Sequence, residues 1–276
     1  MQIAVGEMTF TALTAGPADG PPVLLLHGFP EGARCWERVL VMLADAGLRC
    51  VAPDQRGYSL GARPLGVAAY RLDLLVGDAV GMLDALGWAR ANVVGHDWGA
   101  MVGWALAAGH PDRVRSLTAV SVPHPAAFGE ALRTDADQQR RSAYLRRFRE
   151  PEPAAEGPLL ADDGAGLRAM FAGSGMTADQ VAPLLEGVLA PGALTAALNW
   201  YRAMVAADYA QVGPVDVPTT YVWGSDDVAV GRSAATAAAD QVRADYLFVE
   251  LAQTSHWVPE QAPDLLAAAV LERVRG

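Results

Sequence analysis

Apolar runs alternate with segments of helical periodicity along the first half of the chain. Each run is short, continuous and closed by turn residues, which is typical of a strand buried on both faces of a sheet. The segments between the runs place apolar residues three or four positions apart, as on one face of a helix. Strands that alternate with helices predict a parallel sheet with helices on both faces. The expected strands are "PPVLLLHG" (21–28), "RCVAPD" (49–54), "ANVVGHD" (91–97) and "RSLTAVSV" (115–122), and the expected helices span 33–46, 70–86 and 98–109.

The alternation stops near residue 124. From 125 to 212 the chain shows helical and loop patterns with no convincing strand. The strands resume at 219–224, and a last strand at 245–251 precedes a closing helix at 259–274. An insertion after the sixth strand would lie over the carboxyl ends of the strands, where such sheets bind ligands.

These patterns divide the chain into a core and a cap. We expect an α/β core formed by residues 1–124 and 213–276, which opens with a hairpin at 2–14. The core would contain a mostly parallel sheet of eight strands. Residues 125–212 are expected to form a helical cap inserted into this core.

Composition narrows the classes of partner and chemistry. The net charge of −10 disfavours nucleic acid and anionic membranes as partners. All 21 basic residues are arginine, so neither Schiff-base chemistry nor a P-loop lysine is available. The N-terminus lacks the pattern of a signal peptide and no apolar run reaches 18 residues, so we expect a cytoplasmic protein. Cys35 and Cys50 have no metal-site spacing and are expected to be buried thiols, with no metal or cofactor.

The segment "NVVGHDWGA" (92–100) has the outline of a nucleophile elbow, the sharp strand-to-helix turn G-x-S-x-G. Asp97 occupies the position of the serine, and Gly95 and Gly99 flank it at the spacing that this turn requires. The alternative is that Asp97 only caps the following helix. The two glycines and the apolar strand before them favour the elbow.

Three other segments could supply the partners of an Asp97 nucleophile. "HGFPE" (27–31) follows the first core strand, so the backbone N–H groups of Phe29 and Trp98 could form an oxyanion hole. "WGSDDVAV" (223–230) places Asp226 and Asp227 after a late strand, and we prefer Asp227 as the acid from its spacing to Gly224. His256 follows the last strand, which gives the order nucleophile, acid, histidine.

With these motifs the sequence resembles the α/β-hydrolase superfamily over almost its whole length. "HGFPE", "DQRGYS", "GHDWGA", "GSDD" and "SHW" are similar to segments of soluble epoxide hydrolases and of their dehalogenase relatives. The segment "LNWYRAM" (198–204) resembles the part of the epoxide-hydrolase cap that carries a tyrosine, here Tyr201. In "YLRRFREP" the position of the second cap tyrosine holds Arg147, and Tyr144 lies almost one helical turn earlier.

An aspartate nucleophile is suited to a saturated carbon, because the product is then an ester, whereas attack on an ester carbonyl would give a reactive anhydride. Water activated by His256, which Asp227 would orient, could hydrolyse that ester. An opened epoxide leaves as an alkoxide that needs a proton donor, and Tyr201 favours this substrate over a halide. The alternatives are a haloalkane or haloacid dehalogenase and, ranked lower, a non-hydrolytic or binding protein on the same fold.

The expected partners are therefore a small, largely apolar substrate and water, with a homodimer as an open alternative to a monomer. His124 at the start of the cap and Trp200 beside Tyr201 are candidates for substrate contact, and packing is the alternative role for both. The basic run "RTDADQQRRSAYLRRFRE" (133–150) is most typical of a solvated cap helix, with an anion site as the alternative.

Overall fold

The computed structural model describes residues 1–276, apart from the side chains of residues 206 and 209. Its sheet has the strand order β1-β2-β4-β3-β5-β6-β7-β8. β1 and β2 form an antiparallel hairpin, β2 pairs antiparallel with β4, and every later pairing is parallel. The predicted eight-stranded, mostly parallel sheet is therefore confirmed. The strands are β1 (Gln2–Val5), β2 (Met8–Ala15), β3 (Pro22–Leu26), β4 (Arg49–Pro53), β5 (Ala91–His96), β6 (Val114–Val120), β7 (Thr219–Gly224) and β8 (Tyr246–Leu251).

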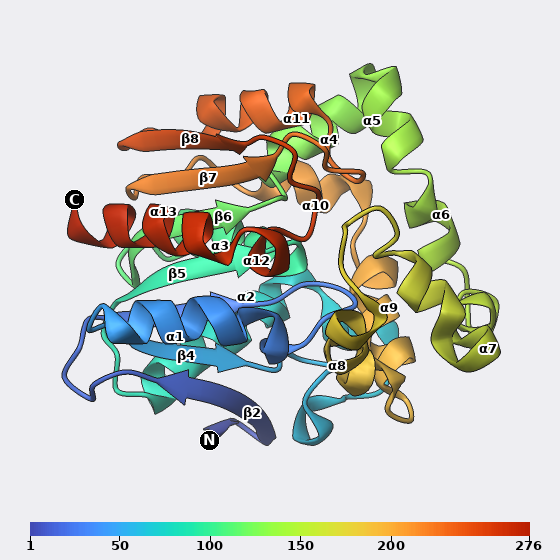
Figure 1. The fold of residues 1–276 in the computed structure, drawn as a ribbon, viewed down its shortest axis with the longest axis horizontal. Helices are drawn as coiled ribbons and strands as arrows, with labels where there is room; N and C mark the ends of the chain where they lie inside the picture. Colours follow the sequence, from blue (N-terminus) through green and yellow to red (C-terminus); the bar gives the residue numbers. More distant parts are fainter.

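The central strands carry apolar residues continuously because both of their faces are covered. Every residue of β5 and of β7 is buried, and so is every residue of β6 except Arg115. α1 and α13 pack together on one face of the sheet, and α2 and α3 pack together on the other (Figure 1). The helices and 3₁₀ turns of this core are η1 (Ala33–Trp36), α1 (Glu37–Asp45), η2 (Leu60–Ala62), η3 (Val67–Tyr70), α2 (Leu72–Ala85), α3 (Trp98–Gly109), α11 (Arg232–Ala237), η4 (Ala238–Gln241), α12 (Val258–Gln261) and α13 (Pro263–Arg275).

Two predicted helices differ from the observed ones at their ends. The helix expected at 33–46 begins as the 3₁₀ turn η1 before α1. The closing helix is divided into α12 and α13, because Pro263 has no backbone N–H and therefore occupies the first position of a new helix. The short helix α11 has no counterpart in the expected elements.

The segment between β6 and β7 is helical, and most of its helices gather at one end of the sheet (Figure 1). The loops that follow β3, β5, β7 and β8 lie at the carboxyl ends of neighbouring parallel strands, so they meet at the same edge. The helices of this segment are α4 (Pro125–Thr134), α5 (Ala136–Arg141), α6 (Tyr144–Phe148), α7 (Glu156–Ala169), α8 (Ala178–Leu189), α9 (Ala193–Ala203) and α10 (Ala206–Gln211).

Buried polar contacts attach the helical segment to the core. The indole Nε1 of Trp200 on α9 donates to the backbone oxygen of Arg56 at 2.9 Å. The Arg56 side chain in turn forms a two-point ion pair with buried Asp78 of α2, with both N···O distances 2.6 Å. At the other end, Nε2 of buried His124 lies 3.1 Å from the backbone oxygen of Gly213, so the two junctions of the segment are joined.

None of the described helices is long and apolar enough on its own to cross a membrane. Among the described helices, α8 and α9 are the only pair that is long and apolar enough for a membrane span when counted together, and they meet at an angle of 81°.

Gly99 is required because α3 begins in close contact with the end of β3. A Cβ atom on Gly99 would lie 2.0 Å from the backbone oxygen of Leu26, which is far inside contact distance. We expect Gly99→Ala to lower the free energy of unfolding by about 3 kcal/mol or more in urea titrations, because the backbone must shift. Gly109→Ala on the same helix is the control, since its Cβ would meet no atom within 4 Å. An equal effect of the two variants would contradict this account.

Candidate active site

The strand-to-helix turn predicted at Asp97 is present and strained. β5 ends at His96, α3 begins at Trp98, and Asp97 between them has φ 52° and ψ −118°. Residues other than glycine seldom adopt a positive φ, so the surrounding structure must hold Asp97 in this conformation. A Cβ atom at Gly95 would lie 2.2 Å from the backbone oxygen of Gly99, which explains the two small residues of the motif.

The loop after β3 supplies a hydrogen-bond donor to Asp97. β3 pairs directly with β5, with Leu26 opposite Gly95, so the "HGFPE" loop lies beside the turn. The backbone N–H of Phe29 donates to Asp97 Oδ1 at 2.8 Å. Trp98 is the first residue of α3, and its N–H therefore has no acceptor within the helix. A role for both N–H groups as an oxyanion hole remains a prediction.

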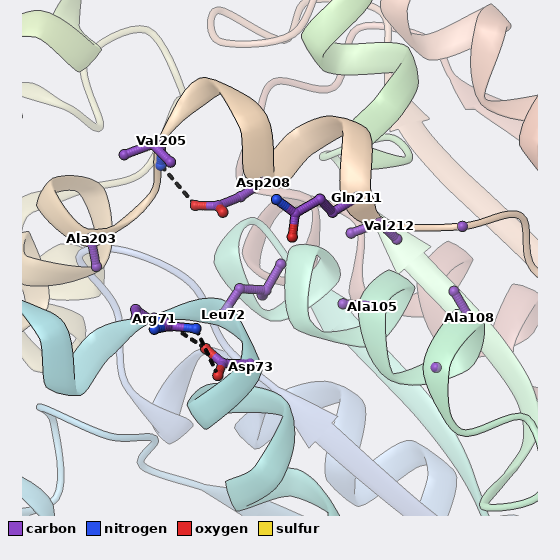
Figure 2. A pocket seen from close by; sticks show the side chains of 12 residues that line it. Arg71, Leu72, Asp73, Ala105, Ala108, Ala203, Val205, Asp208, Gln211 and Val212 are labelled. Carbon is purple, nitrogen blue, oxygen red and sulfur yellow. Dashed lines mark hydrogen bonds and ion pairs between the residues drawn. The ribbon is translucent and has the colours of Figure 1, made fainter.

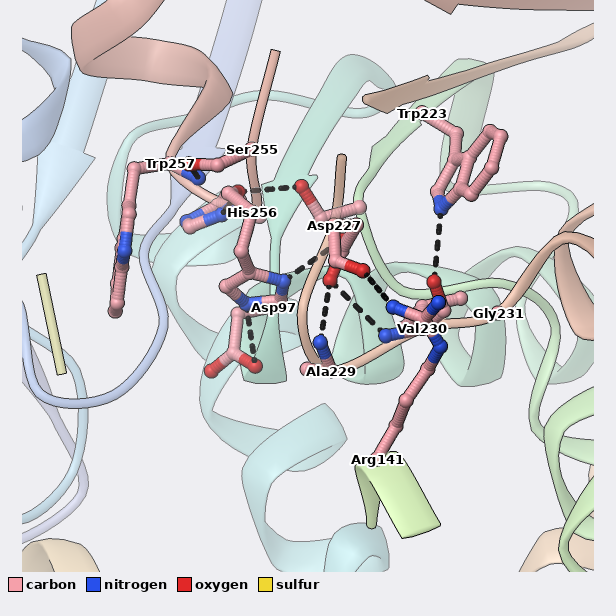
Figure 3. A network of polar contacts seen from close by, with 12 residues as sticks. Asp97, Arg141, Trp223, Asp227, Ala229, Val230, Gly231, Ser255, His256 and Trp257 are labelled. Carbon is pink, nitrogen blue, oxygen red and sulfur yellow. Dashed lines mark hydrogen bonds and ion pairs between the residues drawn. The ribbon is translucent and has the colours of Figure 1, made fainter. Parts of the chain in front are cut away.

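Asp97, His256 and Asp227 lie in one line of contacts, as the sequence order predicts (Figure 3). His256 Nε2 is 3.4 Å from Asp97 Oδ2, and His256 Nδ1 is 2.9 Å from Asp227 Oδ2. The other oxygen of Asp227 accepts the backbone N–H groups of Ala229 and Val230 at 2.7 and 3.0 Å. Asp226 is exposed and accepts from its neighbour Ser225, so the structure pairs Asp227 with the histidine.

A second histidine holds the backbone of the first. The His256 carbonyl oxygen accepts the Ser121 hydroxyl at 2.7 Å and lies 2.9 Å from Nε2 of His96. His96 is fully buried, and its Nδ1 lies 3.3 Å from Oε2 of buried Glu31. His96 and Glu31 both lie within the motifs quoted above, but neither was among the predicted site residues.

The charges of the triad stabilise one another. Burial favours the neutral form of Asp97, but the hydrogen bond and charge of His256 outweigh it and hold the pKa of Asp97 below its usual value. Burial likewise disfavours the imidazolium of His256, but Asp227 first and Asp97 second raise the pKa of His256 well above its usual value. The resting site is therefore an imidazolium between two carboxylates.

A cavity of about 200 Å³ lies over the triad. Its lining includes Asp97 and His256 from the core and Tyr144 and Tyr201 from the helical segment. A second cavity of about 30 Å³ shares Asp97 and both tyrosines. The other walls are almost entirely apolar. They are Phe29, Phe148, Met170, Val228, Ala229 and Trp257 around the larger cavity, and Trp98, Met101, Val122, Phe128, Leu145, Ala229 and Val230 around the smaller one.

A larger pocket of about 670 Å³ lies apart from the triad, between the start of α2, the end of α3 and α10 (Figure 2). Its charged side chains include Arg71 and Asp73, which pair with each other at 3.1 Å. Among its described lining residues there is no member of the predicted site. The convergence of titratable groups, not the pocket volume, therefore identifies the candidate site.

Two tyrosines reach the cavity from the helical segment. Tyr201 of α9 is buried, and its ring centroid lies 5.0 Å from that of Trp98. The ring centroids of Tyr144 and Tyr201 are 6.4 Å apart. Burial and then the charge of Asp97 raise the pKa of Tyr201 well above its usual value, so its hydroxyl keeps its proton. Arg147 is exposed, and Tyr144 lines the cavity instead.

Two residues predicted to contact substrate lie outside the described linings of both cavities. His124 caps α4, accepts the N–H of Ala126 through Nδ1 at 3.2 Å and packs on Trp104. Burial lowers its pKa to about 4, so it is neutral at pH 7. Trp200 points to the backbone of Arg56. The contacts of His124 and Trp200 are therefore those of packing residues, which was the alternative to substrate contact.

Apart from Phe29 and Trp98, the apolar wall residues were not predicted from the sequence, because their side chains carry no chemistry that a motif could mark. Phe148 and Met170, for example, come from α6 and from the loop after α7, where the sequence shows only helical periodicity. One signal was present: Val228 and Ala229 directly follow Asp227 in the quoted loop.

Buried Glu31 and Cys35 and half-buried Glu260 have ligand atoms within 4.8 Å of one another, close enough to hold a metal ion. Burial and then the charge of Glu31 raise the pKa of both the Cys35 thiol and the Glu260 carboxyl well above their usual values. Metal ligands must lose their protons, so this set does not favour a divalent cation. A proton kept on Glu260 removes the charge repulsion between this carboxyl and Glu31.

Comparisons with known proteins agree with this geometry. A family model described as the alpha/beta hydrolase fold matches residues 21–263. The chain is 34% identical to the AB hydrolase superfamily protein YfhM of Bacillus subtilis, over 97% of this chain and 95% of the relative. It is 33% identical to epoxide hydrolase A of Mycobacterium tuberculosis, over 95% of this chain and 92% of that protein.

Solved structures show the same similarity. A structure titled as one of the novel epoxide hydrolases from metagenomes of hot environments has a TM-score of 0.88 and 31% identity, over 100% of this chain and 98% of its own. The epoxide hydrolase of Bacillus megaterium in complex with an inhibitor has a TM-score of 0.90 and 26% identity, over the full length of both chains.

The raised pKa of Glu260 makes stability depend on pH. A carboxyl that must stay protonated in the fold but ionises in the unfolded chain contributes stability below its unfolded pKa, and this is lost as the pH rises towards the folded pKa. Glu260→Gln keeps the size of the side chain and does not ionise. We expect its free energy of unfolding, relative to the wild type, to increase from pH 5 to pH 8, by at most about 1.4 kcal/mol per unit.

Urea titrations at each pH measure this difference. Glu272→Gln removes an exposed carboxyl from the same C-terminal segment and is the control. A Glu260→Gln difference that stays constant from pH 5 to pH 8 would show that Glu260 is not held protonated.

Proposed function

This chain belongs to the α/β hydrolase fold family, and from that premise we propose that it hydrolyses epoxides to vicinal diols through an ester on Asp97. One observation carries the proposal: the Asp97 carboxylate and the hydroxyl-bearing Tyr144 and Tyr201 line the same apolar cavity, with His256 beside them. The epoxide hydrolases among the relatives and the solved structures support the same activity.

Asp97 attacks a saturated carbon of the epoxide ring. Phe29 N–H holds Oδ1, which leaves Oδ2 as the attacking atom. A C–O bond forms between Oδ2 and the substrate carbon, and the ring C–O bond breaks. Oδ1 becomes the carbonyl oxygen of the ester and stays beside the Phe29 donor, where the oxyanion of the next step develops.

The ring oxygen leaves as an alkoxide and must be protonated. Alkoxides are strong bases, and a phenol positioned across the cavity can donate a proton as the ring opens. Tyr201 faces Asp97 from α9, and Tyr144 on α6 is the second donor. Because Tyr201 stays protonated, the donor is available over the whole range of working pH.

His256 then activates water for hydrolysis of the ester. In the resting site Asp97 contributes to the raised pKa of His256. Formation of the ester removes the charge of Asp97, so the pKa of His256 falls. The imidazolium can then return a proton to the tyrosinate left by ring opening, which restores the tyrosine and leaves a neutral imidazole as the base. Asp227 fixes Nδ1 as the protonated nitrogen and stabilises the imidazolium that re-forms.

The cavity limits the substrate by size and polarity. About 200 Å³ with mostly apolar walls fits a compact, apolar epoxide, and the second cavity of about 30 Å³ accepts only a small substituent beside Asp97. Halide displacement at Asp97 is the alternative reaction. It needs N–H donors to the leaving halide, and it does not need the tyrosine hydroxyls.

The covalent route predicts the source of the diol oxygen. In one turnover in ¹⁸O-water the wild-type enzyme should release unlabelled diol, since the first oxygen comes from Asp97. His256→Gln should lower turnover by about 10²-fold or more and retain the ester as a mass increase on the peptide that contains Asp97. Asp97→Asn, the control, should show no such adduct. Labelled diol in the first turnover would exclude the ester mechanism.

The tyrosines should separate epoxide opening from halide displacement. Tyr201→Phe should slow ester formation from a styrene-type epoxide by roughly 10²-fold, because the alkoxide loses its acid. The same variant should leave displacement from an alkyl halide within a few-fold of the wild type. Tyr70→Phe is the control, since its hydroxyl donates to Pro64 O away from the cavity. Equal rates with the epoxide for Tyr201→Phe and the wild type would make Tyr201 a packing residue.

A further inference from the structure

The acid loop, residues 225–231 between β7 and α11, sets the direction of the Asp227 carboxylate. Oδ1 accepts two N–H groups of this loop, from Ala229 and Val230, and Oδ2 faces His256. Because both oxygens are used, the position of the carboxylate depends on the path of the loop backbone. The contacts that fix this path therefore decide whether His256 is oriented.

Helix α5, the second helix of the inserted segment, makes three of these contacts. Gln138 Nε2 donates to Ala229 O, and the N–H of Gly231 donates to Gln138 Oε1, both at 2.8 Å. Arg141 Nη1 donates to the backbone oxygen of Asp227 itself (Figure 3). Gln138 and Arg141 are three residues apart, so they lie on the same side of the helix.

Both side chains are themselves held in place. Gln138 is fully buried and also donates to the Ser142 hydroxyl at 2.8 Å, so its amide has partners on both ends. Arg141 Nε donates to Asp137 Oδ2 at 2.7 Å, one turn earlier on α5. The basic run that contains α5 is therefore not only a solvated helix, since this side of it contacts the acid loop.

We propose that Gln138 and Arg141 are positioning residues, which hold the acid loop so that Asp227 faces His256 Nδ1. The proposal rests on the proposed function for its kinetic consequence. Asp97 attacks the substrate without a base, whereas hydrolysis of the ester needs an oriented His256. Loss of these contacts should therefore slow the second step and spare the first.

The test uses Gln138→Leu and Arg141→Met in the full-length protein with a styrene-type epoxide. Rapid-quench mass spectrometry follows formation and decay of the ester on Asp97. We expect ester decay to slow about tenfold or more and ester formation to stay within twofold, so the ester accumulates. The Arg141 side chain is one-third exposed, so Arg141→Met is the variant less prone to unfolding.

Gln139→Leu and Arg140→Met are matched controls on the same helix. Both side chains are exposed, and their described contacts are with α4 and with Asp137, not with the acid loop. In both control variants the ester on Asp97 should decay at the wild-type rate. Decay within twofold of the wild type in Gln138→Leu and Arg141→Met would overturn the proposal, and so would an equal loss in both steps, which indicates a general structural role.

A second measurement separates this proposal from the proposed function. The His256 Nδ1 proton bonded to Asp227 should give a downfield proton resonance in the resting enzyme, whatever the reaction. Loss or shift of this resonance in Gln138→Leu and Arg141→Met, but not in the two control variants, would support the positioning role. This result would hold even if the wild-type enzyme formed no ester. An unchanged resonance would contradict the proposal, and an absent wild-type ester alone would contradict the proposed function.

Discussion

The site depends on one buried interaction, an imidazolium between two carboxylates. His256 lies 3.4 Å from Asp97 and 2.9 Å from Asp227, and all three side chains are buried. A buried charge is costly unless it is paired and hydrogen-bonded. Each member therefore needs the other two, and the loops after β5, β7 and β8 must all present their side chains to the same point. The parallel pairing of neighbouring strands satisfies that requirement, because their carboxyl ends share one edge.

In the mechanism that we propose, the same electrostatic balance separates the two chemical steps. While Asp97 is charged, it helps to keep His256 protonated and is itself held ionised, as a nucleophile must be. In the proposed mechanism, an ester on Asp97 would leave Asp227 to oppose the desolvation of the imidazolium. His256 would then become a base when hydrolysis of the ester needs one. The burial of the three side chains strengthens this exchange, since charges interact more strongly where water is excluded.

The sequence predicted those parts of the fold and site that local physics determines. Central strands are apolar throughout because both faces are covered, and the glycines around Asp97 reflect clashes that any Cβ would cause. Asp97, Asp227 and His256 lie in the loops after β5, β7 and β8, so their order in the sequence is the order of these strands. Whether Tyr144 or Arg147 lines the cavity could not be predicted from the sequence, because it depends on the rotation of a five-residue helix about its axis. His124 and Trp200 were placed near substrate by their position in the chain, whereas their ring nitrogens bond to backbone oxygens of the cap junction and the core.

The contacts of α5 with the acid loop show a more general reason for this difference. Gln138 and Arg141 bond to backbone groups of residues 227, 229 and 231, and every residue type except proline offers the same backbone oxygen and N–H. No pairing of side-chain types therefore marks the contact in the sequence, even though one partner is the residue that orients the histidine. Residues that react are visible as motifs because their chemistry restricts them. Residues that support the reacting groups through the backbone become visible only once the chain is folded.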